Sequence, residues 1–335
     1  MSKGTSQSAL RDRFDEFAAD RTLQDWVIDL GPFALLALLM IVFSLTSPVF
    51  LTFSNLVDNV LRNSTILLLV SLAGTFPILQ QSIDLSIESI VGITGVIAAI
   101  LISDFQLGLL GLVAAVVAGT VFGTLNGIVF AKFKIPSFLV TLGSLSILSG
   151  TALLMTGGTS IPYRNPGVRW IATGYIIPGV PNLVVWGLLF YLLFVFVAFK
   201  TPFGRYCYAL GENETVADLS GVDVDRYKIG SFLVSGMLCG IAGALLTART
   251  ASAAPGMGSG LLLQSIAAIV MGGTALTGGV GGPHRTLLGV LVIGVLANGM
   301  NLVGIQSFVQ DIVLGFVVII AVAMSMDRRK IDIVK

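Results

Sequence analysis

The feature that most constrains this chain is a series of long apolar runs separated by short polar segments. Ten such runs lie at 30–47, 61–80, 85–103, 107–131, 137–157, 181–199, 229–248, 261–276, 286–303 and 306–326. A helix needs about 20 apolar residues to cross a bilayer, and shorter segments span it when they are tilted or buried among neighbours. The boundaries of the third and eighth runs are the least clearly marked. The sequence therefore predicts an all-α, polytopic membrane bundle of about ten transmembrane helices.

Composition excludes several classes of function. The chain is 55% hydrophobic and 11% charged, which is less than half the charge content of a soluble domain. Its 19 basic residues form no stripe, so no nucleic-acid partner is predicted. His284 is the single histidine, and no lysine follows a P-loop glycine pattern. We therefore expect no catalytic site, metal or cofactor on this chain, and we expect Cys207 and Cys239 to be reduced structural thiols.

Basic residues predict which side of the membrane each segment occupies, because Lys and Arg near span ends stay in the cytoplasm. With ten spans, both chain ends lie on one side. Arg62, Arg164, Arg169 and Arg249 fall on the other side, and the rest of the 19 basic residues fall on the side of the ends. We therefore predict cytoplasmic tails at 1–29 and 327–335, a membrane domain at 30–326, a cytoplasmic loop at 201–228 and an extracytoplasmic loop at 158–180.

The extracytoplasmic loop leaves two interpretations open. Arg164 and Arg169 are suited to acidic groups on a docking protein. The same arginines, with Trp170 and Tyr175, are equally suited to anchoring the loop among membrane lipid headgroups.

Glycine spacing predicts where helices pack closely. Small residues four apart form one face at Gly119, Gly123 and Gly127 and another at Gly236, Gly240 and Ala244. Such faces let helix backbones approach within van der Waals contact in a membrane. The glycine-rich segment 271–283 lacks a lysine, so it is interpreted as a tight cytoplasmic turn with close helix approach rather than a phosphate site.

Polar side chains inside the spans are the candidates for a transport role. Asp84 and Glu88 begin the third run, where carboxylates either cap a helix or take part in gating or ion coupling. Uncharged candidates for a polar-solute pathway are Asn126, Gln264, Asn298 and Asn301. Each of these is also suited to a hydrogen bond between neighbouring helices.

The polar loop 201–228 contains the signals of a short capped helix. Asn213 is placed to cap a helix over 214–220, Gly221 to end it in a left-handed conformation, and Asp223 to cap the next helix. A short helix held between two membrane spans is suited to serve as a handle by which a soluble partner acts on the membrane domain.

The same loop carries a family resemblance. G-E-N-E-T-V-A-D-L-S-G-V-D-V-D-R-Y-K from Gly211 resembles the coupling segment of the permeases of monosaccharide-type ATP-binding-cassette (ABC) importers, the ribose, xylose, arabinose and galactoside group. Further blocks follow in the family's order, among them F-L-T-F-S-N-L, I-D-L-S, I-P-S-F-L-V-T-L-G, I-A-A-I-V-M-G-G-T-A-L-T-G-G and L-A-N-G-M-N-L-V-G. The series covers residues 47–329. Branched-chain amino acid permeases belong to the same superfamily.

The resemblance implies a bacterial inner-membrane permease that works with other chains. Two permease subunits, identical or different, form the pathway; ABC ATPase subunits bind the ATP; and an extracytoplasmic binding protein delivers the sugar. The residues that the resemblance assigns to ATPase coupling are Glu214, Ala217, Asp218, Leu219 and Gly221. We expect Ala217 and Leu219 to pack into a groove of the ATPase. The alternatives are an ABC permease for nucleosides, branched-chain amino acids or a furanose-type signal, and an ion-coupled secondary transporter.

The chain departs from the family's pattern beside the I-D-L-S block. Gln81, Ser82 and Glu88 occupy positions where the family commonly has glycine or another small residue. These departures point to different local packing, and to different gating, at this place.

The charge distribution makes a topological prediction. A fluorescent reporter fused after Lys335 should be active, and an alkaline phosphatase fused there should be inactive, because both chain ends are expected in the cytoplasm. An active phosphatase at this position would contradict the assigned orientation.

Overall fold

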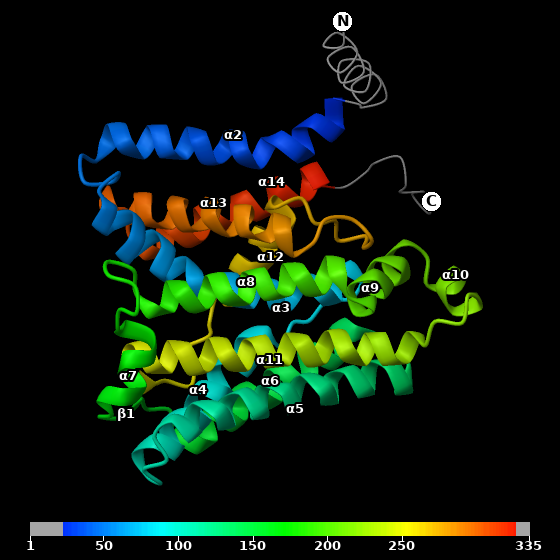
Figure 1. Cartoon of the computed structure of the whole chain (residues 1–335), viewed down its shortest axis with the longest axis horizontal. Helices are drawn as coiled ribbons and strands as arrows, with labels where there is room; N and C mark the ends of the chain where they lie inside the picture. Colours follow the sequence, from blue (N-terminus) through cyan, green and yellow to red (C-terminus); the bar gives the residue numbers. More distant parts are fainter. Residues whose placement is uncertain (1–22, 326–335) are drawn as a thin grey trace, which may run out of the picture.

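The computed structural model describes residues 23–325, and the two tails predicted at 1–29 and 327–335 lie wholly or largely outside this range. The regular elements of the described chain are helices, apart from two short strands (Figure 1). Its elements in order are α2 (Leu23–Thr46), the π-helical turn η1 (Asn55–Leu61), α3 (Arg62–Leu79), α4 (Ile87–Ser103), α5 (Leu109–Phe133), α6 (Ser137–Thr156), β1 (Ile161–Pro162), α7 (Pro166–Thr173), α8 (Asn182–Lys200), α9 (Pro202–Glu212), α10 (Glu214–Leu219), α11 (Val224–Thr250), β2 (Ser252–Ala253), α12 (Leu261–Met271), α13 (Pro283–Leu302) and α14 (Ser307–Ser325).

Each of the ten apolar runs forms a helix, so the all-α prediction is confirmed. Within the described residues, six helices are long and apolar enough to cross a membrane, and the apolar parts of α2, α4, α12 and α14 are shorter. α12 is the shortest of the ten helices, because it ends at Met271 instead of 276. Its 11 residues extend about 16 Å, which is only half of the hydrocarbon layer.

The core of the bundle is built around α3. Every residue from 64 to 79 of this helix is buried, so the helix is covered on all sides by other parts of the chain. A helix that is apolar all round is expected at the centre of a membrane bundle. The helices α4, α8, α11, α12 and α13 all pack against it.

The helices α5 and α11 pack through the two predicted glycine faces. A Cβ atom at Gly119 would lie 2.7 Å from the Cα atom of Gly240, and one at Gly123 would lie 2.7 Å from the Cα atom of Gly236. Real Cβ atoms do not approach backbone this closely, so only glycine allows the contact. The prediction of close packing at these positions is confirmed.

α4 and α12 start inside the molecule and run in opposite directions. The loop before α4 follows the end of α3 at Leu79, beside α9, whereas the loop before α12 follows β2, which pairs with β1. The two loops therefore enter from opposite ends of the bundle. They meet where the backbone N–H of Gly260, the residue before α12, donates to Glu88 Oε2 in the first turn of α4, at 3.1 Å.

The two long polar connections lie at opposite ends of the bundle. Figure 1 shows α7 and β1 at one end and α9 with α10 at the other, where the described chain also begins and ends. Connection 158–180 is structured, because Asn165 caps α7 and the strands pair Ile161 with Ala253. This arrangement agrees with the sides inferred from basic residues, while the orientation of the bundle in a membrane stays a prediction.

The glycine contact predicts how two substitutions differ. Gly123→Ala should lower the free energy of unfolding by about 1–3 kcal/mol, because the added methyl overlaps the Phe232 carbonyl oxygen. Gly315→Ala on α14 is the matched control, since a Cβ there meets nothing within 4 Å. Thermal unfolding of both variants in lipid nanodiscs measures the difference, and equal stabilities would contradict the packing.

Candidate functional site

The predicted short helix is present and its caps are those expected. Asn213 Oδ1 accepts from the N–H of Val216 at 3.0 Å, and Gly221 has a φ of 84°. Asp223 Oδ1 accepts from the N–H of Arg226 at 3.1 Å and so caps α11. α10 therefore has a fixed orientation at the end of the bundle, where Figure 1 shows it projecting beyond α9.

Ala217 and Leu219, the two α10 residues expected to pack into an ATPase groove, differ in their exposure. Ala217 is 6% exposed and packs against Leu210 and Val224, so its side chain faces this chain and not a partner. The exposed apolar residues are Leu219, at 83% exposure, and Val216, at 57%. Sequence spacing alone did not distinguish the two faces, because a helix of six residues shows too little periodicity.

The remaining predicted coupling residues surround this apolar pair. Glu214 and Asp218 are exposed, and Glu214 Oε1 forms an ion pair with Lys228 Nζ at 2.7 Å, which ties α10 to α11. Asp225, in the first turn of α11, bonds Lys132 at 3.1 Å and Lys134 at 3.0 Å. The hydrogen bond that Lys134 Nζ donates to the Asp225 carboxylate raises the pKa of Lys134 and favours its charged form. These pairs hold α5, α10 and α11 together at this end.

α9, which the sequence did not predict as a separate helix, contacts the membrane bundle through a cluster that we name the glycine junction: Leu79, Gln81, Gly211, Gly278 and Gly279. The N–H of Gly279 donates to the Leu79 carbonyl oxygen at 3.0 Å. A Cβ at Gly211 would overlap that same oxygen. The predicted close approach at 271–283 is therefore confirmed, and it joins α9, the end of α3 and the glycine-rich turn.

Three polar contacts reinforce the glycine junction. Gln80 Nε2 donates to Cys207 Sγ at 2.9 Å and to the Tyr227 carbonyl oxygen at 3.2 Å. Tyr208 Oη donates to the Gly281 carbonyl oxygen at 2.7 Å. Burial raises the pKa of Cys207 to about 12, so its sulfur stays a neutral thiol that accepts this bond. Both cysteines are buried and free, in agreement with a structural role.

Asp84 organises a buried network at the start of α4. Its Oδ1 accepts from the N–H and the hydroxyl of Ser86, at 3.0 and 2.5 Å, and its Oδ2 accepts from Ser235 Oγ of α11 at 2.7 Å. Asn126 Nδ2 of α5 donates to Ser86 Oγ at 2.9 Å. Asp84 and Asn126 therefore join α4, α5 and α11, which is the structural alternative open to each of them.

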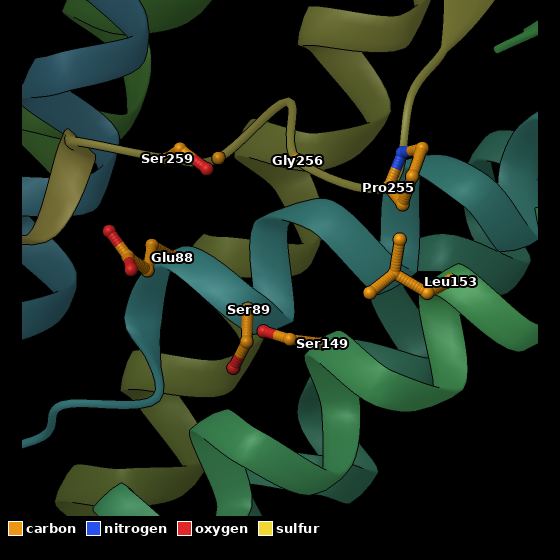
Figure 2. A pocket seen from close by; sticks show the side chains of 8 residues that line it. Glu88, Ser89, Ser149, Leu153, Pro255, Gly256 and Ser259 are labelled. Atoms are coloured by element: carbon orange, nitrogen blue, oxygen red, sulfur yellow. The ribbon is translucent and has the colours of Figure 1, made fainter. Parts of the chain in front are cut away.

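Glu88 stands at the edge of a cavity of about 210 Å³ (Figure 2). The cavity lies between α4, α6 and the loop before α12, and its lining is Glu88, Ser89, Ser149, Leu153, Pro255, Gly256, Gly258 and Ser259. Figure 2 shows Ser89 and Ser149 facing each other from α4 and α6. The lining supplies hydroxyls, backbone groups and one carboxylate, which are groups that bind a small polar solute through hydrogen bonds.

The other predicted pathway residues lie elsewhere and are used differently. Asn298 and Asn55 exchange two amide hydrogen bonds, at 3.0 and 3.1 Å. Asn301 Oδ1 accepts from Gln310 Nε2 at 2.9 Å. Gln264 is half-buried in the second turn of α12. The four amides are not brought together, and the cavity-lining serines were not predicted. The signal for them was the Pro- and Gly-interrupted stretch 253–260 before an unusually short apolar run, a pattern typical of transporter binding sites.

The Asp84 network makes a prediction about stability. Asp84→Ala should lower the free energy of unfolding by about 2–5 kcal/mol, because it leaves buried donors of Ser86 and Ser235 without their acceptor. Asp104→Ala is the matched control, since Asp104 is exposed and, among the side chains that the structure describes, accepts only from its neighbour Ser103. Chemical unfolding in detergent measures both variants. A change within about 0.5 kcal/mol for Asp84→Ala would show that the network carries no stability.

Comparisons with known proteins agree with the sequence resemblance. Residues 56–322 match the family described as the permease component of branched-chain amino acid transport systems. The ribose import permease of Bacillus subtilis (strain 168) is 39% identical over 303 residues, covering 90% of this chain and 93% of that protein. The ribose import permease of Escherichia coli (strain K12) is 35% identical, covering 91% and 95%. The D-allose transport system permease of the same organism is 31% identical, covering 88% and 90%.

No solved structure matches this chain. The family match spans most of the residues that the structure describes, and the sequence relatives cover nearly the whole of each chain. The chain therefore belongs to this family of multi-pass membrane permeases, as the resemblance predicted.

Proposed function

We propose that this chain is the permease subunit of an ATP-driven importer for a monosaccharide or a closely related polar solute. The names of its relatives, ribose and D-allose permeases, support this class of substrate. The hydroxyl-lined cavity beside Glu88 is chemically suited to such a solute, because it offers both donors and acceptors to sugar hydroxyls. An extracytoplasmic binding protein delivers the solute to the end of the bundle that carries α7. The chain lies in the bacterial inner membrane, with both tails on the cytoplasmic side.

The observation that carries the ATPase coupling is the exposed apolar pair on α10. Leu219 and Val216 project from a helix that is fixed by caps at both ends and by the ion pair of Glu214 with Lys228. Exposed apolar residues on a rigid polar surface are typical of protein interfaces. An ABC ATPase supplies the ATP site, and closure of its two copies moves α10 and the attached α9. Glu214, Ala217, Asp218, Leu219 and Gly221 form or support this surface.

The exposed face of α6 is the surface on which we place a second permease subunit, identical or different. Ser146 and Thr151 are exposed on this helix, and their hydroxyls donate to backbone carbonyls of the preceding turn. Gly143 and Gly150 have open space around them. Small residues let helix backbones approach closely in a membrane, so this face is suited to packing against a second subunit, which would enclose the cavity between the two copies.

Leu219→Asp should separate coupling from folding. The side chain is exposed, so the variant should fold, while a charge in an apolar interface weakens ATPase binding on the order of 10- to 100-fold. Co-purification of the ATPase and uptake of radiolabelled ribose or allose by the complete importer measure the effect, and Leu219→Met is the conservative control. Wild-type uptake by the aspartate variant would contradict the assigned interface.

A further inference from the structure

Gln81 has a backbone conformation that L-residues seldom adopt. Its φ is 58°, in the left-handed region where glycine is favoured. Gln81 immediately follows the C-cap of α3, at the first residue of the loop that leads to Asp84 and α4. A residue with a Cβ atom is less stable than glycine in this conformation, so the contacts of the Gln81 side chain must offset that cost.

The Gln81 side chain joins three elements of the glycine junction. Its Nε2 donates to the Gly211 carbonyl oxygen of α9 at 2.7 Å. A Cβ atom at Gly278 would lie only 2.6 Å from the Gln81 Cγ atom, so the Gln81 side chain packs closely against the glycine-rich turn. The loop that starts at Gln81 is therefore fixed to α9 by a side chain as well as by the contact of Leu79 with Gly279.

The same loop is fixed at its far end to the cavity. Ile83 N–H donates to Ser137 Oγ at the start of α6 at 3.2 Å, and Asp84 holds the Ser86 turn. Glu88 then lines the cavity and accepts from Gly260 N–H at the start of α12. One short segment, 81–88, thus connects α9 to both helices that border the cavity.

We propose that Gln81 is a positioning residue that transmits movement of α9 to the cavity through segment 81–88. The proposal rests on the proposed coupling of α10 to an ATPase. When α10 and α9 move, the bond from Gln81 to Gly211 makes the loop move with them, and the starts of α4 and α6 shift relative to each other. Without this bond the chain is still held at Leu79 by its contact with Gly279, but the loop from Gln81 onward follows α9 less closely, and ATP hydrolysis proceeds with less solute movement.

The chain contains a matched control for this residue. Gln106 has a φ of 54°, is exposed, and donates from its Nε2 to the Ser103 carbonyl oxygen three residues before it. It shares residue type, backbone conformation and kind of bond with Gln81, but its bond joins no distant elements. A glycine at either position removes the side chain and relieves the backbone.

The test compares Gln81→Gly, Gln81→Asn and Gln106→Gly in the complete importer reconstituted in lipid. Asparagine tolerates the left-handed conformation but is one methylene too short for the bond. Hydrogen exchange of residues 82–86 should be about fivefold faster in both Gln81 variants, the effect of losing one hydrogen bond. Solute transported per ATP should fall severalfold in the same two variants, and Gln106→Gly should match the wild type in both measurements.

Two results would overturn the proposal. Wild-type exchange in both Gln81 variants would show that the side chain does not hold the loop. Faster exchange with an unchanged ratio of solute to ATP would show that the bond does not transmit movement. A wild-type importer that moves neither ribose nor allose would instead count against the proposed substrate class, and hydrogen exchange would still decide whether Gln81 holds the loop.

Discussion

The absence of water in the hydrocarbon layer is the constraint on which the rest of this structure depends. Every buried backbone N–H and C=O must find a partner inside the protein, and helices alone satisfy this rule locally. The two loops that enter the bundle break the helical pattern and find other partners. Ser82 N–H bonds the Pro77 carbonyl oxygen, Ile83 N–H bonds Ser137, and Ser86 N–H bonds Asp84. Irregular backbone is tolerated at membrane depth where it is buried in protein or lines a cavity, and Ser82 and Ser86 are both buried.

Close backbone contact through glycine holds the elements of this bundle rigidly together. Contacts at Gly123 and Gly236, and at Gly211 and Gly279, place one backbone directly against another with no flexible side chain between them. Such contacts allow little relative displacement before atoms overlap, so packed elements move together or not at all. The glycine junction therefore attaches α9 firmly to α3 and to the glycine-rich turn. This attachment is what lets a soluble partner at α10 act on a cavity inside the membrane domain.

The sequence predicted the helices and their caps well, because these depend on local chemistry. The apolar runs, the Asn213 and Asp223 caps and the left-handed Gly221 all follow from neighbouring residues. The direction of Ala217 depends on where Leu210 lies in space, so local spacing did not reveal it. The pathway amides were the least predictable, because Asn298 is separated from its partner Asn55 by 243 residues. One sequence signal went unused, since the short eighth run, preceded by a stretch rich in Pro and Gly, marked a helix that begins inside the bundle.

The most direct test of this account measures whether segment 81–88 moves with α10. Spin labels at Ser220 and Ile83 report the distance between α10 and the loop, and labels at Ile83 and Thr151 report the distance from the loop across to α6. We predict that the first distance stays constant when ATP is trapped in the assembled importer, while the second changes. A first distance that changes while the second stays constant would show that α10 moves without the loop, and it would contradict the central claim.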